Sequence, residues 1–325
     1  MNKIESIQLL RTFAAISVIL THISFVKSGS YGVDIFFIIS GFLMMYSTEK
    51  GLEKYWRKKV FRIVPFYWFM TIVTAIAVAI MPNLFNSYEV SGIYLLKSLC
   101  FMPYEHNGIH QPILGLGYTL NYEMLFYLIF FVSAQIAKKI NYKIRGWVCT
   151  FIILCMVVVG RCNLPMPFSF WCNTLILEFV VGIVLYYLFD YFCINQKIIT
   201  INRFHENFFG LLIIISIVFL WNTNIFAEGI IRIICWGGMS ALLFVAVYIY
   251  FYKKEIPSLF LLIGNVSYYI YLSHPYCVRL TEKIVFRFIG KNVVGYVFVV
   301  VISVSSSLVC GYCLKKAFEK IIKSN

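Results

Sequence analysis

The chain has 325 residues, of which 61% are hydrophobic and only 13% are charged. An ordinary soluble domain carries about 25% charged residues, so this chain has too few charges to cover a surface that faces water, and an ordinary soluble fold is excluded. The net charge of +14 would suggest a nucleic-acid partner on a soluble protein, but in a membrane protein Lys and Arg first report orientation, and we expect no nucleic-acid partner.

The apolar runs predict about ten membrane spans, because a spanning helix needs about 20 mostly apolar residues. These runs are 5–26, 31–48, 62–82, 119–137, 145–161, 168–190, 208–222, 230–251, 259–278 and 292–314. The longest link, 83–118, contains a short apolar stretch at 93–102 that fits a re-entrant or interfacial helix. The eighth run contains Gly237 and Gly238 and the ninth is short and rich in Tyr, so either one can be broken or tilted. The sequence therefore predicts an all-α, polytopic membrane helix bundle, a single domain over 1–325 without a soluble extra-cytoplasmic domain.

The basic residues are distributed unequally between the predicted loops. With the N-terminus inside, the inner segments carry most of them, and the outer segments up to Arg232 carry only isolated ones. Because cytoplasmic loops are enriched in Lys and Arg, we expect both termini in the cytoplasm. The last outer loop is the exception, and it carries Arg279, Lys283, Arg287 and Lys291.

Among the ionisable residues of the predicted spans, five positions stand out: Arg11, His22, Asp34, Glu123 and His274. Such residues are costly in lipid and mark candidate functional sites. In the predicted topology His22, Asp34, Glu123 and His274 come from four helices and reach a similar depth near the outer surface, whereas Arg11 lies nearer the cytoplasm. A His beside a carboxylate can deprotonate a hydroxyl. The alternatives are a hydrogen-bonded helix contact for each His and a helix cap or interfacial residue for each carboxylate.

The predicted inner loop from Lys50 to Arg62 is rich in basic residues. Guanidinium and ammonium groups bind phosphates well, so this segment is a candidate site for a phosphorylated cytoplasmic ligand. The alternative is a juxtamembrane segment attracted to anionic lipid headgroups.

Five motifs, in order along residues 5–315, resemble those of the acyltransferase-3 family of membrane O-acyltransferases that act on bacterial cell-surface polysaccharide. They are Leu10-Arg11-Thr12-Phe13-Ala14-Ala15 through His22; Gly32-Val33-Asp34-Ile35-Phe36-Phe37-Ile38-Ile39-Ser40-Gly41-Phe42; the basic segment from Arg57 to Trp68; Tyr118-Thr119-Leu120-Asn121-Tyr122-Glu123 with Phe126 and Tyr127; and Gly264-Asn265-Val266-Ser267-Tyr268-Tyr269-Ile270-Tyr271-Leu272-Ser273-His274. Tyr118 stands where the family usually has Trp, and Lys59 stands at the first position of an Arg-x-x-Arg pair. Lys is a point charge without the planar fork of Arg, so weaker geometric selectivity for a phosphate is expected there.

The resemblance implies an O-acetyltransferase in the bacterial inner membrane, with acetyl-coenzyme A or another acyl-coenzyme A as the donor substrate. The acceptor would be a hydroxyl of a lipid-linked or polymeric surface glycan such as O-antigen, capsule or exopolysaccharide. Lys58, Lys59 and Arg62 would hold the donor phosphates, with the pantetheine arm passing Arg11. His22, with Asp34 or Glu123, would be catalytic, and Ser40, Tyr271 and His274 would line the acceptor end. The ten cysteines show no metal-ligand spacing, so neither a metal nor a bound cofactor is expected.

Two other classes of protein fit the polar spans. A proton-coupled transporter or exporter also uses intramembrane His and carboxylate residues as proton relays, but the sequence lacks the paired interrupted helices of inverted repeats. A structural subunit would use the same residues only to hold helices together. Transfer from labelled acetyl-coenzyme A would separate the enzyme from both.

Overall fold

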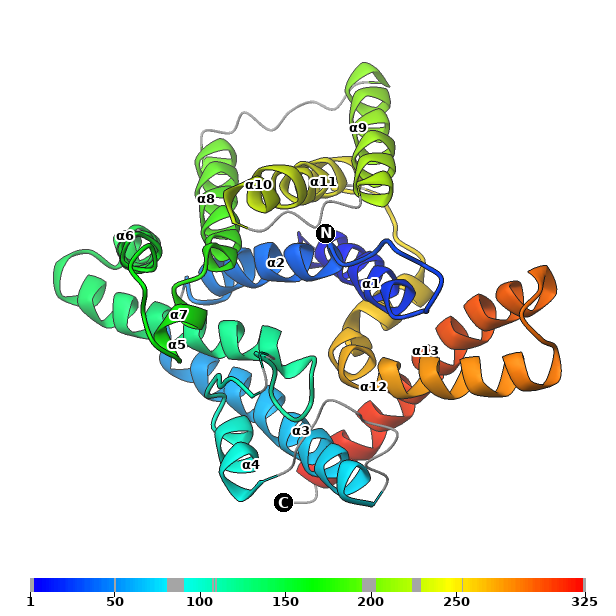
Figure 1. Cartoon of the computed structure of the whole chain (residues 1–325). Coiled ribbons are helices and arrows are strands. Elements are labelled where there is room, and N and C mark those ends of the chain that lie inside the picture. Colours follow the sequence, from blue (N-terminus) through cyan, green and yellow to red (C-terminus); the bar gives the residue numbers. More distant parts are fainter. Residues whose placement is uncertain are drawn as a thin grey trace. The chain divides into compact units, whose positions relative to one another are not determined.

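The computed structural model describes residues 3–49, 51–80, 91–106, 108, 110–194, 203–223, 229–252 and 254–323 (Figure 1). Within these ranges all the regular elements are helices and no strand is present. The α-helices are α1 (Lys3–Thr21), α2 (Gly32–Ser47), α3 (Glu53–Ile80), α4 (Gly92–Leu99), α5 (Gly117–Ile140), α6 (Arg145–Val159), α7 (Phe168–Trp171), α8 (Leu177–Ile194), α9 (Arg203–Asn222), α10 (Ile230–Arg232), α11 (Gly238–Tyr250), α12 (Ser258–Phe288) and α13 (Val293–Lys323). Short 3₁₀-helices cover Tyr142–Ile144 and Thr174–Ile176, and a π-helix covers Ile233–Gly237.

The predicted all-α, multi-pass membrane class is confirmed. Each of the ten predicted runs overlaps one main helix, and in the described part of the chain seven helices are long and apolar enough to cross a membrane. α2 is a shorter apolar helix. α12 continues to Phe288, well beyond the predicted end of its apolar run. Hydropathy ended the prediction early because the last third of this helix carries charged residues. The count of ten spans and the side on which the termini lie stay predictions.

Two smaller predictions about the elements are also resolved. The eighth run is interrupted by the π-helix Ile233–Gly237, next to the glycine pair that predicted a break. The ninth run, in contrast, is one continuous helix that includes Pro275. The link 83–118 contains the short helix α4, which overlaps its predicted apolar stretch, while residues 81–90 lie outside the described part.

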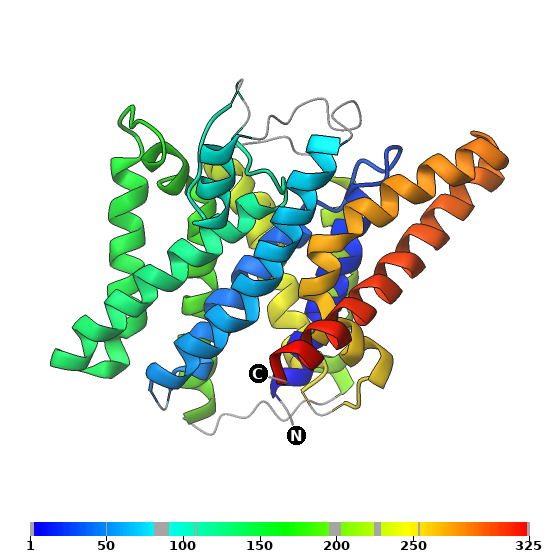
Figure 2. The same cartoon turned by 90° about the horizontal axis from the view of Figure 1, so that it is seen from below.

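The chain forms two compact units, residues 1–39 with 187–325 and residues 40–186, and each is described by itself. In the first unit α12 packs against both α1 and α13, and Figure 2 shows α12 and α13 as a long hairpin. Its core includes Ile19, Val266 and Ile270. A β-carbon on Gly264 would lie 2.3 Å from the Gln8 carbonyl oxygen, so only glycine permits this close approach of α12 to α1.

In the second unit the aromatic side chains of α3 anchor α4. Tyr67 Oη donates to the carbonyl oxygen of Ser98 at 3.0 Å, and Trp68 Nε1 donates to that of Leu99 at 2.8 Å. Arg145 at the start of α6 is buried and donates to the carbonyl oxygen of Met45 at 2.9 Å. Helix ends leave carbonyl groups without intrahelical partners, so Arg145 satisfies one of those at the end of α2.

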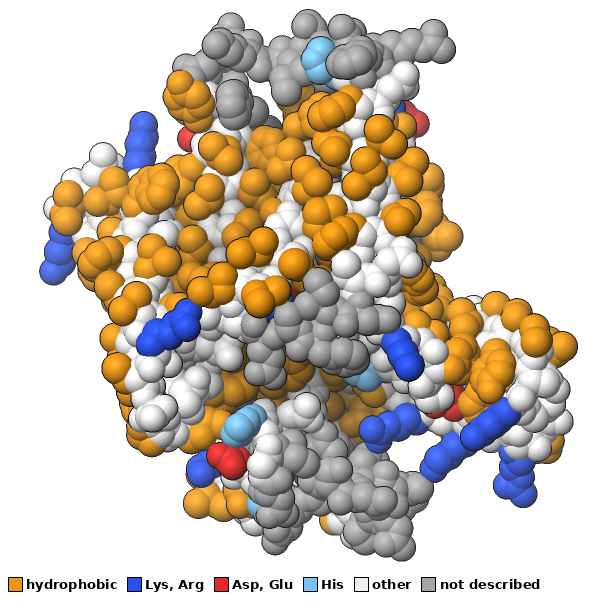
Figure 3. All heavy atoms as spheres, turned by 45° about the horizontal axis from the view of Figure 1, so that its top comes forward, with side chains coloured by type: hydrophobic (Ala, Val, Ile, Leu, Met, Phe, Trp, Pro, Cys, Tyr) orange, Lys and Arg blue, Asp and Glu red, His pale blue; other side chains and the backbone are white. Residues whose placement is uncertain are grey.

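Hydrophobic side chains cover much of the face shown in Figure 3. On α9, for example, Leu211, Ile214 and Val218 are 55%, 60% and 54% exposed, and they recur at helical spacing. Water-soluble monomers rarely expose apolar patches of this extent. These faces are suited to contact with lipid.

Candidate functional site

His22 follows the last residue of α1, and its ring lies against His274 of α12. The two ring centroids are 4.7 Å apart with the planes at 80°, and His274 Nε2 lies 3.2 Å from His22 Nδ1. His274 is fully buried, whereas His22 is exposed. The structure therefore brings together two of the four residues that were expected to converge.

The hydrogen bonds of His22 determine which nitrogen carries the proton in the neutral ring. His22 Nδ1 lies 2.9 Å from the carbonyl oxygen of Val18. A carbonyl oxygen can only accept a hydrogen bond, so Nδ1 must be the protonated nitrogen and Nε2 keeps its lone pair. Within the described ranges Nε2 has no hydrogen-bond partner. His22 therefore presents an available basic nitrogen at the exposed end of α1.

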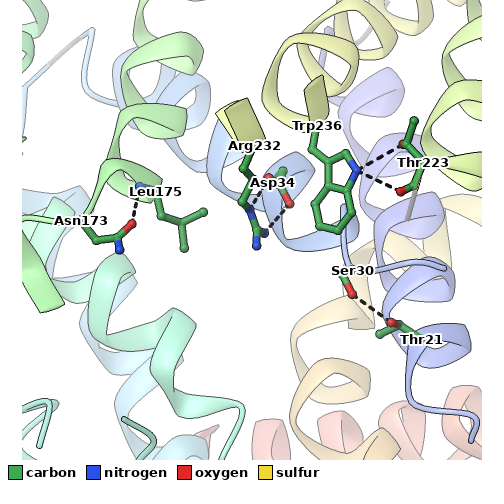
Figure 4. A network of polar contacts seen from close by, with 8 residues as sticks. All are labelled: Thr21, Ser30, Asp34, Asn173, Leu175, Thr223, Arg232 and Trp236. Atoms are coloured by element: carbon green, nitrogen blue, oxygen red, sulfur yellow. Dashed lines mark hydrogen bonds and ion pairs between the residues drawn. The ribbon is translucent and has the colours of Figure 1, made fainter. Parts of the chain in front are cut away.

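Two glycines hold the start of α2 against α1. A β-carbon on Gly29 would lie 2.1 Å from the carbonyl oxygen of Ser17, and one on Gly32 would lie 2.6 Å from that of Ala14. Gly29 also has a φ of 120°, which L side chains rarely adopt. The hydroxyls of Thr21 and Ser30 are 3.0 Å apart and close the same turn (Figure 4). These contacts fix the position from which Asp34 projects.

Asp34 is fully buried and forms an ion pair with Arg232 of α10 (Figure 4). Arg232 Nη2 donates to Asp34 Oδ2 at 2.9 Å and Nε donates to Oδ1 at 3.3 Å, which is bidentate geometry. The guanidinium also lies 4.9 Å from the ring of Trp236, whose Nε1 donates to Thr223 Oγ1 at 3.2 Å. Among the described residues Asp34 shares no hydrogen bond or ion pair with His22, and its carboxylate is paired with Arg232. The catalytic role expected for Asp34 stays a prediction.

Sequence reasoning did not anticipate Arg232, which it treated only as an isolated basic residue of an outer loop. The available signal was its place in the first turn of the eighth run, at the same predicted membrane face as Asp34. A buried carboxylate needs a compensating charge, and Arg232 is one of the few basic residues that the predicted topology places at that face. Charge pairing across the predicted spans would therefore have made Arg232 one of several candidate partners of Asp34.

The second unit contains a separate polar network around Glu123 of α5. Ser40 Oγ donates to Glu123 Oε1 at 3.1 Å, and Tyr127 Oη donates to the same oxygen. Lys59 Nζ in turn donates to Tyr127 Oη at 3.0 Å and lies 5.0 Å from that ring. Glu123 thus accepts from both hydroxyls through the same oxygen. Three residues assigned from sequence to three different roles therefore share one network, joined by Tyr127.

The remaining predicted residues lie in different surroundings. Tyr271 is 7% exposed, and its ring centroid is 6.0 Å from that of Phe36. Arg11 is half-buried on α1 and Arg62 is exposed on α3. The side chain of Lys58 lies outside the described residues. The roles proposed for these side chains stay predictions.

Sequence analysis also missed Glu178, which is fully buried in α8 of the second unit. It lies inside the sixth apolar run, so an acidic residue at membrane depth was the signal. Among the described residues, no group of three or more His, Cys, Asp or Glu side chains is placed to hold a metal ion.

Comparison with known proteins places this architecture in a family. The "Acyltransferase domain" model of the acyltransferase-3 family matches residues 4–312. The exopolysaccharide production protein ExoZ of Rhizobium meliloti strain 1021 is 32% identical over 166 residues, which cover 48% of this chain and 50% of ExoZ. The peptidoglycan O-acetyltransferase OatA of Listeria monocytogenes is 27% identical over 176 residues, covering 48% of this chain and 27% of that protein. The O-acetyltransferase OatA of Staphylococcus aureus strain NCTC 8325 is 25% identical over 169 residues, covering 46% and 28%.

The matches to these relatives cover half or less of each of them. No solved structure matches the chain significantly. The family model, in contrast, extends over nearly the whole chain and includes all five motifs identified in the sequence. The chain belongs to the acyltransferase-3 family.

Proposed function

We propose that the protein is a membrane O-acetyltransferase of the bacterial inner membrane that transfers an acetyl or other short acyl group from cytoplasmic acyl-coenzyme A to a hydroxyl of a surface glycan. Membership in the acyltransferase-3 family supports the reaction class. The names of two relatives, an exopolysaccharide production protein and a peptidoglycan O-acetyltransferase, support a glycan acceptor. The single observation that carries the chemistry is the exposed His22 ring with its Nδ1 engaged and its Nε2 available.

His22 Nε2 acts as the general base in this mechanism. It takes the proton of the acceptor hydroxyl as the hydroxyl oxygen forms a bond to the thioester carbonyl carbon. The carbon–sulfur bond then breaks, and the coenzyme A thiolate leaves and takes up that proton from the imidazolium. The products are the O-acyl ester and free coenzyme A, and His22 returns to its neutral form.

The direct test uses purified full-length protein in detergent with labelled acetyl-coenzyme A and an oligosaccharide acceptor. The enzyme is expected to produce O-acetylated oligosaccharide and free coenzyme A in equal amounts. A glycan exporter or a structural subunit would release no coenzyme A and form no ester. Absence of both products with every glycan class offered would contradict the proposal.

The basic segment of α3 provides a further prediction about donor binding. Arg62 is exposed, whereas Lys59 is already bound to Tyr127. Because a charge-assisted hydrogen bond to phosphate would be lost, Arg62→Gln is expected to raise KM for acetyl-coenzyme A by about tenfold with little change in kcat. Lys59→Gln is expected to lower kcat as well, since it disturbs the network around Glu123.

Steady-state kinetics with varied donor concentration would measure both variants. Lys138→Gln is the matched control, because Lys138 is an exposed basic residue at the end of α5 in the same unit. An Arg62→Gln protein with an unchanged donor KM would remove the assigned phosphate contact.

A further inference from the structure

The hydrogen-bond donors of His274 can be assigned in the same way as those of His22. His274 Nδ1 lies 2.8 Å from the carbonyl oxygen of Tyr271 and 3.2 Å from that of Ile270. Both partners can only accept, so Nδ1 carries the proton of the neutral ring and Nε2 keeps its lone pair. That lone pair faces the protonated Nδ1 of His22 at 3.2 Å. The ring Nδ1–H of His22 thus has two acceptors within reach, the Val18 carbonyl oxygen and His274 Nε2.

The residue after His274 explains why a carbonyl is available to its ring. In an α-helix the N–H of residue 275 would bond to the carbonyl of residue 271. Residue 275 is a proline inside α12 and has no N–H. The Tyr271 carbonyl therefore lacks its usual backbone donor, and His274 Nδ1 supplies one.

A similar situation occurs at the end of α1. The backbone N–H of His22 bonds to the carbonyl oxygen of Ile19 at 3.1 Å, in the tighter pattern of a helix end. The Val18 carbonyl, which is the usual partner of this N–H, is then bound by the His22 ring at 2.9 Å. Pro275 thus leaves a carbonyl group that orients the His274 ring, and the end of α1 leaves one that orients the His22 ring.

We propose that His274 is a positioning residue for the general base His22, and that Pro275 determines which nitrogen of the His274 ring carries the proton. This proposal rests on the proposed function. With its Nδ1 proton held by the Tyr271 carbonyl, His274 offers Nε2 only as an acceptor. It therefore keeps the His22 proton on Nδ1, leaves His22 Nε2 free to accept the hydroxyl proton, and stabilises the imidazolium that forms. No proton passes to His274 in the reaction.

The proposal changes the role predicted for His274 from the sequence, where it lined the acceptor end. The ring is fully buried and both of its nitrogens have partners within the protein. It has no remaining polar atom for a glycan. A positioning residue of this kind should affect kcat and leave the acceptor KM nearly unchanged.

His274→Leu, His274→Gln and Pro275→Ala test the proposal. His274→Leu removes the acceptor and is expected to lower kcat by about ten- to a hundredfold, the usual effect of losing a hydrogen bond to a charged group. His274→Gln retains an acceptor oxygen and should recover part of this loss. In Pro275→Ala the new N–H competes for the Tyr271 carbonyl, so kcat should fall by a few-fold and the second tautomer of His274 should appear. Pro65→Ala is the matched control for the histidine tautomers only, because Pro65 also lies inside a helix, α3 of the other unit.

Imidazole nitrogen NMR of ¹⁵N-histidine-labelled full-length protein in detergent provides a readout that does not depend on activity. The chain has five histidines, and His22→Gln and His274→Gln assign the two signals. Both rings are expected as the Nδ1-protonated tautomer in the unsubstituted protein and in Pro65→Ala. An Nε2-protonated His274, equal tautomer populations in Pro275→Ala and Pro65→Ala, or an acceptor KM rather than a kcat effect in His274→Leu would each overturn the proposal. None of these outcomes decides whether the donor is acetyl-coenzyme A, so this proposal and the proposed function can fail separately.

Discussion

His22→Ala is expected to reduce acyl transfer by about 10²–10⁴-fold, the range that a positioned general base contributes. The reason is local: the variant removes the available Nε2 at the exposed end of α1 but leaves the helix itself unchanged. The loss should appear in kcat, because binding of donor and acceptor does not require the imidazole. Initial rates with labelled acetyl-coenzyme A at saturating donor and acceptor would measure it.

Two controls separate loss of the base from loss of the fold. His110→Ala removes a histidine whose side chain is 52% exposed and pairs with Glu105 at the surface, so its rate should equal that of the unsubstituted protein. Because His22 is accessible, added imidazole should restore part of the activity of His22→Ala. A His22→Ala protein that folds and transfers acetyl groups at the normal rate would exclude His22 as the base.

The sequence predicted the helices better than it predicted their partners. Hydropathy located each main helix because apolar runs reflect the cost of placing polar groups in lipid. It stopped short on α12, where the helix continues through Arg279 and Lys283 to Phe288, because hydropathy measures transfer into lipid and does not measure helix formation. The glycine pair at 237 and 238 did indicate where the backbone departs from α-helix.

The polar side-chain contacts were harder to predict from the sequence than the helices. The chance that His22 and His274 meet could be inferred from their similar depth, since depth follows from position along a span. Rotation about the helix axis does not follow from depth, and it decides which neighbours a side chain contacts. Asp34 therefore pairs with Arg232, and Lys59 reaches Tyr127. Neither contact is encoded in a local pattern, because 198 residues separate Asp34 from Arg232 and 68 separate Lys59 from Tyr127.

The tautomers of the histidine pair were, in contrast, partly readable from the sequence. A proline directly after a histidine in a helix frees the carbonyl four residues before the proline. His274-Pro275 meets this condition. The sequence could not show that the His22 ring contacts His274. The position of the proton on His274 matters for His22 only because His22 Nδ1 lies 3.2 Å from His274 Nε2.

Breaking the Asp34–Arg232 pair is expected to have the largest effect on stability. Arg232→Gln leaves a carboxylate that is fully buried without its counter-charge, and removing one partner of a buried ion pair costs about 3 kcal/mol or more. The melting temperature in detergent should fall by about 5–10 °C. Asp34→Leu alone should have a smaller effect, because the Arg232 side chain is 25% exposed and can reach solvent.

The double variant Asp34→Leu/Arg232→Met decides whether the pair has a function beyond stability. Replacing both members of a buried pair by apolar residues of similar size is often neutral or stabilising, so the melting temperature should return close to that of the unsubstituted protein. If the pair only joins α2 to α10, activity should return with it. If Arg232 and Asp34 also act on the substrate or on His22, the double variant will be stable but inactive. A double variant as unstable as Arg232→Gln would contradict the assignment of the stability loss to the unpaired carboxylate.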